Sequence, residues 1–335
     1  MKKIGSILRI VLPLGLGIFL VWYVFSKLTP SDVEDIKQSF RSANYWWIGL
    51  SLLLGLLSHM SRAWRWKYTL KPINYYPKFY NSFFSVMIAY LVNLAIPRLG
   101  EVTRCTVMSR YENMKFNKLL GTVIAERVAD LMILLSFMTV TLILQFDNVK
   151  HLLEGTFVET IMTNPVPLAA TVIAGLAAAW LGLRLLRISQ NNFIIKIRSF
   201  IEDVIEGLKS ILTMKDRWLF ILHTVLIWIL YFGMFWVGFY SIPGLSDVPF
   251  EGVLAGFVLG GISIAATNGG IGAYPLAIQA ILLLYNVDSN TGLAFGWIIW
   301  TAQTIMILLI GGASFILMPV LNKKKADELN TSHFE

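Results

Sequence analysis

Six runs of about 20 mostly apolar residues constrain the fold of this chain more than any other feature. A helix rises about 1.5 Å per residue, so each run is long enough to cross the ~30 Å of hydrocarbon in a bilayer. Within that layer every backbone polar group needs a partner in the protein, which a helix supplies by itself. The sequence therefore predicts an all-α membrane protein. The runs lie at about Leu8–Phe25, Tyr45–Trp64, Leu119–Phe146, Pro167–Leu186, Trp218–Tyr240 and Gly292–Leu317.

Composition supports this class and argues against others. Hydrophobic residues make up 56% of the 335 residues and charged residues only 14%, which is too apolar for a soluble protein of this size. The net charge of +8 comes from basic residues in particular loops, so it indicates how the chain is oriented in the membrane rather than binding to nucleic acid. One cysteine and four scattered histidines indicate neither a disulfide framework nor a metal centre.

Two further apolar segments are broken in the middle. Phe79–Pro97 leads into a charged stretch, and Gly252–Tyr285 is interrupted at Thr267–Gly272 by Thr-Asn-Gly-Gly-Ile-Gly. Clustered glycines end a helix, and the pieces on either side are short for a span. We therefore expect two re-entrant hairpins, over about 79–117 and 252–286.

Basic residues indicate the orientation, because cytoplasmic loops of membrane proteins are enriched in lysine and arginine. Lys2 and Lys3 place the N-terminus in the cytoplasm. No small-residue cleavage site follows the first run, so we expect a retained span rather than a signal peptide. The loop after the second run is basic and therefore cytoplasmic. We interpret Arg62 and Arg65 there as solvated charges or contacts to lipid headgroups.

The same rule favours hairpins for the broken segments. A full crossing by Phe79–Pro97 would put the basic connector that follows it outside, whereas a hairpin keeps it inside. The prediction is six full transmembrane helices plus two oppositely directed re-entrant helical hairpins, in one domain over residues 1–320 with both termini cytoplasmic. We also expect a cytoplasmic amphipathic helix over about 188–215 and a disordered cytoplasmic tail over 321–335.

Broken helices that meet from opposite sides are typical of transporters with inverted halves, which bind substrate where the breaks meet. The late break offers backbone amides and the positive end of the following half-helix, which favour an anion. The alternative is a flexible kink. The candidate binding residues of this break are Asn268, Gly269, Gly270 and Gly272.

Charged residues are dense in and after the first broken segment. Burying ions at membrane depth costs roughly 2.5 to 10 kcal/mol each, so such groups are normally paired and functional. An entering phosphate could displace a carboxylate from an arginine, because the guanidinium fork fits either oxyanion. The alternative is that these residues only join two helices, although small residues would do so without burying charge. The candidate binding residues here are Arg98, Glu101, Arg104, Glu126, Arg127 and Asp130.

Three motifs together resemble a known family: Pro97–Arg104 (PRLGEVTR), Glu126–Asp130 (ERVAD) and Gly269–Gly272 (GGIG). They are similar to the transmembrane region of lysylphosphatidylglycerol synthases, a domain also found alone in the UPF0104 family of bacterial inner-membrane proteins. In the synthases this region is regarded as a flippase for aminoacylated phospholipid, and aminoacyl transfer belongs to a separate soluble domain for which this chain has no room. The resemblance implies lipid translocation or lipid binding. The late segment departs from the family pattern, with Asn268 in place of proline and Tyr274-Pro275 in place of an acidic residue.

We therefore expect a flippase-like protein of the bacterial inner membrane that binds and translocates an anionic or zwitterionic phospholipid, aminoacylated or not, or a lipid-linked molecule. The arginines would hold the phosphate, and the carboxylates would orient them or contact a cationic headgroup. Its partner would be a lipid headgroup and not nucleic acid, with a homo-oligomer left open. No nucleophile–base set, nucleotide loop or metal pattern appears, so neither an enzyme nor a cofactor is predicted. The alternatives are a membrane scaffold for an envelope-lipid-modifying enzyme and an intramembrane enzyme acting on a headgroup.

Overall fold

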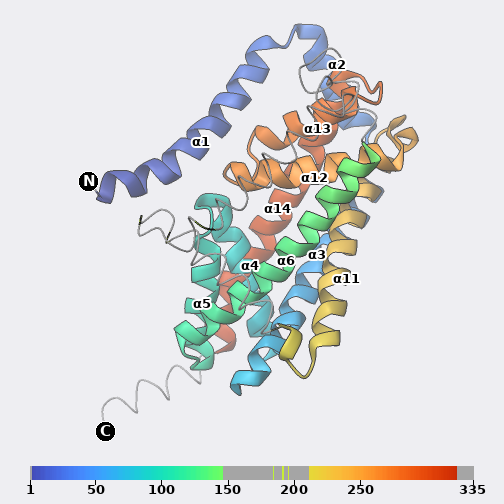
Figure 1. The fold of residues 1–335 in the computed structure, drawn as a ribbon. Helices are drawn as coiled ribbons and strands as arrows, with labels where there is room; N and C mark the ends of the chain where they lie inside the picture. The colour runs from blue at the N-terminus through green and yellow to red at the C-terminus, as the bar shows by residue number, and fades with distance from the viewer. Residues whose placement is uncertain (1, 146–183, 185–190, 192–194, 196–210, 323–335) are drawn as a thin grey trace.

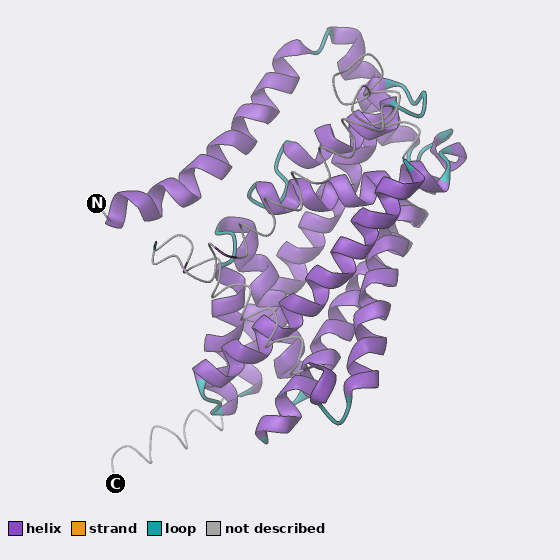
Figure 2. Cartoon of the chain, viewed as in Figure 1, coloured by secondary structure: helices purple, strands orange, loops and turns teal. Residues whose placement is uncertain are grey.

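The computed structural model describes residues 2–145, 184, 191, 195 and 211–322, and within them the regular elements are all helical (Figures 1 and 2). This confirms the all-α prediction for that part of the chain. The α-helices are α1 (Lys2–Lys27), α2 (Pro30–Ser42), α3 (Tyr45–Leu70), α4 (Phe79–Ala95), α5 (Leu99–Glu112), α6 (Phe116–Leu144), α11 (Arg217–Gly238), α12 (Phe250–Ala266), α13 (Ala273–Leu283) and α14 (Ser289–Leu321). Short 3-10 turns lie at Lys71–Ile73, Phe239–Ser241 and Leu245–Asp247.

Among the described residues, 3 helical stretches are long and apolar enough to cross a membrane: Phe116–Leu144, Arg217–Ser241 and Ser289–Leu321. A fourth candidate is the pair Leu14–Lys27 and Pro30–Ser42, bent by 113°. The described residues thus confirm a membrane protein with three or four candidate spans, and not the count of six.

Three predicted segments lie mostly outside the described residues. They are the run Pro167–Leu186, the amphipathic helix over 188–215 and the tail over 321–335. The run Tyr45–Trp64 falls within α3, whose C-terminal part carries Arg62 and Arg65 and so lowers the apolar character of the helix.

The first hairpin is formed by α4 and α5, and the chain turns back at Pro97. Pro97 has no N–H to bond the carbonyl of Asn93, so α4 ends just before it. The side chain of Asn93 instead accepts the backbone N–H of Gly100 at 2.7 Å, which satisfies one of the free amides at the start of α5. A Cβ at Gly100 would overlap the carbonyl oxygen of Ala89, so only glycine permits this close approach of the two helices.

The second hairpin is formed by α12 and α13, which run antiparallel. A Cβ on Gly252 would lie 2.9 Å from the ring of Tyr285, and a Cβ on Gly260 would lie 2.8 Å from the ring of Tyr274. The contacts of α12 thus run forward from Gly252 to Gly260, while their partners run backward from Tyr285, just after α13, to Tyr274 at its start. The break between the helices falls where the sequence predicts it. Its left-handed residues are Gly269, Gly270 and Gly272, with φ of 61°, 82° and 67°.

The first half of α14 supports the second hairpin. A Cβ on Gly296 would lie 2.6 Å from Cα of Pro275, so α14 and α13 are in close backbone contact there. One turn later, the indole N–H of Trp300 donates to the carbonyl of Gly269 at 2.7 Å. Trp300 thus holds the break of the second hairpin.

The second half of α14 supports the first hairpin. A Cβ on Gly311 would lie 2.9 Å from the carbonyl oxygen of Met87 in α4. At the end of α14, the side-chain amide of Asn322 donates to that of Asn81 at 2.9 Å. The open ends of the two hairpins therefore lie toward opposite ends of α14 (Figure 1).

The breaks of the two hairpins touch beside the middle of α14. The amide nitrogen of Asn268 donates to the carbonyl of Ala95, at the end of α4, with a distance of 3.4 Å. A Cβ on Gly269 would lie 3.0 Å from the side chain of Leu94. Two chain breaks that are 173 residues apart in the sequence are thus in direct contact.

The contact at Gly100 yields a stability prediction. Replacing Gly100 with alanine forces α4 and α5 apart, and overpacking of this kind costs about 1 to 3 kcal/mol. We expect the Gly100→Ala variant to unfold at a lower temperature than the unchanged protein in detergent, measured by intrinsic tryptophan fluorescence. Gly121→Ala is the control, because Gly121 is exposed in α6 with no atom within 4 Å of the added Cβ. Equal unfolding temperatures for the two variants would contradict this account of the first hairpin.

Candidate functional site

Seven charged side chains from three helices form one cluster, named here the charged cluster. They come from the C-terminal half of α3, the first turns of α5 and the middle of α6. Each is joined to at least one other by an ion pair. Its members are Arg62, Arg65, Glu101, Arg104, Glu126, Arg127 and Asp130.

Asp130 is the anion on which most of the arginines converge. Its two oxygens accept from Nη1 of Arg62 at 2.5 Å and from Nη1 of Arg65 at 2.8 Å. Arg127 approaches the same carboxylate at 3.7 Å. Arg65, which is fully buried, also donates to the hydroxyl of Thr224 in α11 at 3.0 Å. Asp130 therefore joins α3 to α6, and Arg65 extends the network to α11.

Glu126 lies one turn before Asp130 on α6 and is also fully buried. It accepts from Nη1 of Arg104 at 2.7 Å and lies 3.6 Å from Nε of Arg65. The guanidinium of Arg104 also lies over the ring of Trp66, 3.6 Å from its centroid. A cation–π contact of this kind stabilises a desolvated arginine by about 2 kcal/mol or more. Glu126 and Trp66 together hold Arg104 between α5, α6 and α3.

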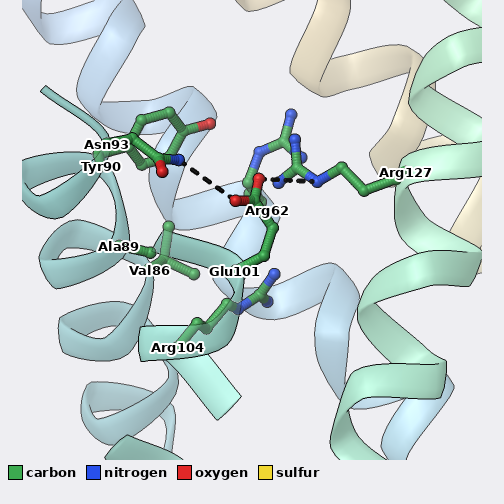
Figure 3. Close-up of a pocket in the computed structure, with 8 residues that line it drawn as sticks. All are labelled: Arg62, Val86, Ala89, Tyr90, Asn93, Glu101, Arg104 and Arg127. Atoms are coloured by element: carbon green, nitrogen blue, oxygen red, sulfur yellow. Dashed lines mark hydrogen bonds and ion pairs between the residues drawn. The ribbon is translucent and has the colours of Figure 1, made fainter. Parts of the chain in front are cut away.

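Glu101 and Arg127 form a looser outer pair (Figure 3). Their nearest charged atoms are 3.6 Å apart, and their side chains are 25% and 43% exposed. Asn93 donates to Glu101 over 3.5 Å, which is at the limit of a hydrogen bond. The outer pair is therefore held more weakly than the inner pairs around Asp130 and Glu126.

The charged cluster has more donors than acceptors. Its four arginines and three carboxylates leave a net charge of +1. Five buried guanidinium nitrogens have no hydrogen-bond partner among the described residues: Nε of Arg62, and Nε and Nη2 of both Arg65 and Arg104. One buried acceptor, Oε1 of Glu126, is also without a hydrogen-bond partner and lies 3.6 Å from Nε of Arg65, so the other four nitrogens are the spare donors. A buried unpaired polar group costs about 1 to 3 kcal/mol, more when it is charged, so these donors indicate a site for water or an anion.

A cavity of about 40 Å³ is lined by two of these arginines, Arg62 and Arg104, and we name it the cluster pocket (Figure 3). It has room for a few water molecules. Its lining combines guanidinium groups with a carboxylate, an amide, a phenol and two small apolar side chains. The lining residues are Arg62, Val86, Ala89, Tyr90, Asn93, Glu101, Arg104 and Arg127.

Most residues predicted from the charged stretch lie in the charged cluster: Glu101, Arg104, Glu126, Arg127 and Asp130. Arg98 does not. It is exposed in the turn of the first hairpin with a left-handed φ of 66°, and the ion pairs among the described residues do not include it.

The interpretation of Arg62 and Arg65 as solvated or headgroup charges is wrong. Their exposed fractions are only 3% and 0%, and they bind the central carboxylate of the charged cluster. A signal for this was present in the sequence. Ser58, Arg62, Arg65 and Thr69 are spaced by three or four residues, which places them on one polar face of α3.

Among the described residues, the late glycine break is separate from the charged cluster. Asn268 and the glycines take part neither in the ion pairs of the charged cluster nor in the lining of the cluster pocket. The side-chain oxygen of Asn268 is buried without a hydrogen-bond partner. The amides of Ala273 and Tyr274 donate to carbonyls within the same turn, so these two amides are not free for an anion. The predicted binding role of Asn268, Gly269, Gly270 and Gly272 stays a prediction.

Comparison with known proteins gives a family match over most of the chain. The model of a family described as "Lysylphosphatidylglycerol synthase TM region" matches residues 10–311. A curated relative, the "UPF0104 membrane protein MJ1595" of Methanocaldococcus jannaschii, is 25% identical over 118 residues, which is 34% of this chain and 35% of that protein. The chain thus matches about a third of the length of this relative. No solved structure matches.

The inner ion pairs predict a large effect of removing one carboxylate. In Asp130→Asn, Arg62 loses its counter-ion and Arg65 loses the nearer of its two, while the shape of the side chain is kept. Breaking a buried pair from one side costs about 3 to 5 kcal/mol, so we expect a marked fall in the unfolding temperature in detergent. The control is Glu34→Gln, because Glu34 pairs with Arg41 at the surface and should contribute little. Similar unfolding temperatures for both variants would show that the charged cluster does not stabilise the fold.

Proposed function

The chain belongs to the lysylphosphatidylglycerol synthase transmembrane-region family, and on that basis we propose that it binds the phosphate of a membrane lipid in the cluster pocket and translocates the lipid. The lipid is anionic or zwitterionic, or is a lipid-linked molecule. The observation that carries this proposal is that Arg62 and Arg104, which line the cluster pocket, have buried guanidinium nitrogens without hydrogen-bond partners among the described residues. A phosphate supplies several acceptor oxygens at once, which matches spare donors of this geometry.

Binding proceeds by exchange at the outer pair. Glu101 is the carboxylate held most weakly, and it lies between Arg127 and the amide of Asn93 (Figure 3). An entering phosphate takes the place of this carboxylate at Arg127 and reaches Arg62 and Arg104 behind it. The released Glu101 is then free to contact a cationic part of the headgroup.

Entry of a headgroup requires local movement, because the cluster pocket has a volume of only about 40 Å³. Arg127 is the group best placed to move, since its side chain is 43% exposed and its ion pairs are 3.6 and 3.7 Å long. The inner pairs of Asp130 and Glu126 stay closed and hold the three helices together during the exchange.

The two hairpins provide the conformational change. We assign them as oppositely directed re-entrant elements, with both termini in the cytoplasm and the protein in a bacterial inner membrane. Support comes from their contact at Asn268 and Ala95 and from their opposite placement along α14. In transporters built this way, one broken helix pair opens while the other stays closed. No chemical step is assigned to the protein.

The topology can be tested with introduced cysteines. The only natural cysteine, Cys105, is buried, so the unchanged protein should give little background. Lys115→Cys, at the open end of the first hairpin, should react with an impermeant maleimide only from the cytoplasm. Asp247→Cys, before the second hairpin, should react only from the exterior. Reaction of both positions from the same side would overturn the opposed arrangement.

Lipid movement tests the binding site. We expect Arg127→Gln in reconstituted vesicles to slow the translocation of headgroup-labelled phosphatidylglycerol roughly ten- to hundredfold. A loss of that size corresponds to one charge-assisted hydrogen bond of about 1.5 to 3 kcal/mol. The fold should persist, because the ion pairs of Arg127 are long and partly exposed.

The matched control is Arg110→Gln, which removes an exposed arginine from α5 at a distance from the pocket lining. It should leave translocation unchanged. Equal translocation in all three proteins would remove the cluster pocket as the binding site. Translocation absent from the unchanged protein, with a stable complex of a second envelope protein, would favour a scaffold, and a change in the mass of the lipid would indicate an enzyme.

A further inference from the structure

A buried histidine lies directly behind the cluster pocket. His59 is on α3, three residues before Arg62, and only 3% of it is exposed. Residues at this spacing share a helix face, with about 5 to 6 Å between their Cβ atoms. His59 does not line the cluster pocket and is not part of the charged cluster among the described residues. The proposed binding step gives it no role.

A chain of hydrogen bonds joins His59 to the pocket. Tyr90 lines the cluster pocket, and its hydroxyl lies 2.7 Å from the hydroxyl of Tyr231. The Tyr231 hydroxyl in turn lies 3.3 Å from Nδ1 of His59. Phenol and imidazole groups can each both donate and accept, so a proton can pass along this chain by reversing the direction of its hydrogen bonds. The pocket and the imidazole are therefore connected through two tyrosine hydroxyls.

While the pocket is empty, the surroundings of His59 favour the neutral imidazole, because burial opposes a charge there. On α3 the nearest charge is Arg62, whose positive charge opposes protonation. Tyr90 on α4 and Tyr231 on α11 are polar but uncharged contacts. Asp130 on α6 is directed to Arg62 and Arg65 rather than to His59. The sequence of α14 contains no ionisable side chain.

An anion in the cluster pocket changes this balance. The charged cluster has a net charge of +1, so the imidazolium of His59 would add a second positive charge close to Arg62. A bound phosphodiester offsets one of these charges. We propose that His59 is a proton-binding site coupled to the cluster pocket, so that the protein takes up a proton together with the anionic headgroup. This inference rests on the proposed function and adds the proton as the coupled ion.

The coupling has a defined sign. If the anion favours the protonated imidazole, then protonation favours the anion to the same degree, because linkage between two binding sites is reciprocal. The affinity for the anion is therefore highest at low pH. It falls as the pH rises through the titration of His59 in the occupied state, by at most about tenfold per pH unit for one linked proton.

The experiment is isothermal titration calorimetry of the full-length protein with short-chain phosphatidylglycerol. The titration is repeated in two non-phosphate buffers that differ in ionisation enthalpy, which measures the protons taken up for each anion bound. The probe itself keeps a single charge near neutral pH, so it contributes no proton. We expect the unchanged protein to take up protons when it binds the probe, with the number rising toward about one as the pH is lowered into the titration range of His59 in the occupied state.

Two variants identify the group. His59→Gln keeps a hydrogen-bonding side chain that does not titrate, and it should bind the probe with the proton uptake lost. His223→Gln is the control, because His223 contacts Ser61 and lies outside the chain from the pocket. It should take up protons as the unchanged protein does.

The two proposals fail in different ways. Binding of the probe without proton uptake by the unchanged protein, at every pH tested, would overturn the inference about His59 and leave the binding site standing. Uptake that persists in His59→Gln would overturn it as well. Binding that is unaffected by Arg127→Gln would remove the binding site and the proton coupling together.

Discussion

The constraint on which the structure depends is the high free-energy cost of an unpaired ion in a low-dielectric interior. Asp130 and Glu126 are buried on α6, and each is matched by arginines from other helices. Such a network forms only when α3, α5 and α6 are all in place, because no single helix carries a complete set of partners. The charged cluster thus requires α3, α5 and α6 to pack together, and it specifies which faces of the three helices meet.

Close backbone packing supplies the second part of the architecture. Gly100 brings α5 onto α4, Gly260 brings α12 onto α13, and Gly296 brings α14 onto the second hairpin. Membrane helices gain little from burying apolar surface against each other, since lipid is equally apolar, so van der Waals contact through small residues takes its place. These contacts set α14 beside both hairpins and bring their breaks together at Asn268 and Ala95. The irregular backbone of the second break, from Thr267 to Gly272, is thereby largely buried in protein.

The charged cluster combines two roles that the sequence presented as alternatives. The inner pairs around Asp130 and Glu126 are short and buried, as expected of groups that join helices. The outer pair of Glu101 and Arg127 is long and partly exposed, as expected of groups that exchange partners with a ligand. In the proposed mechanism, depth in the cluster therefore separates the pairs that hold the helices together from the pair that exchanges with the ligand, and Arg62 and Arg104 contribute to both roles. His59 lies deeper still, behind the cluster pocket, and two tyrosine hydroxyls connect it to the pocket.

The all-helical membrane class, the breaks at Pro97 and at the late glycines, and the unusual position of Glu126 and Asp130 inside an apolar run can be read from the amino-acid sequence. These features depend on local properties: apolar run length, the missing N–H of proline, the backbone freedom of glycine, and charge inside an apolar run. The burial of Arg65, the exposure of Arg98 and the pairing of each arginine with its carboxylate come from the packing of the helices. The burial of a charge depends on helices that are distant in the chain, and no local sequence pattern contains that information. Arg65 and its partner Asp130, for example, are separated by 65 positions in the sequence.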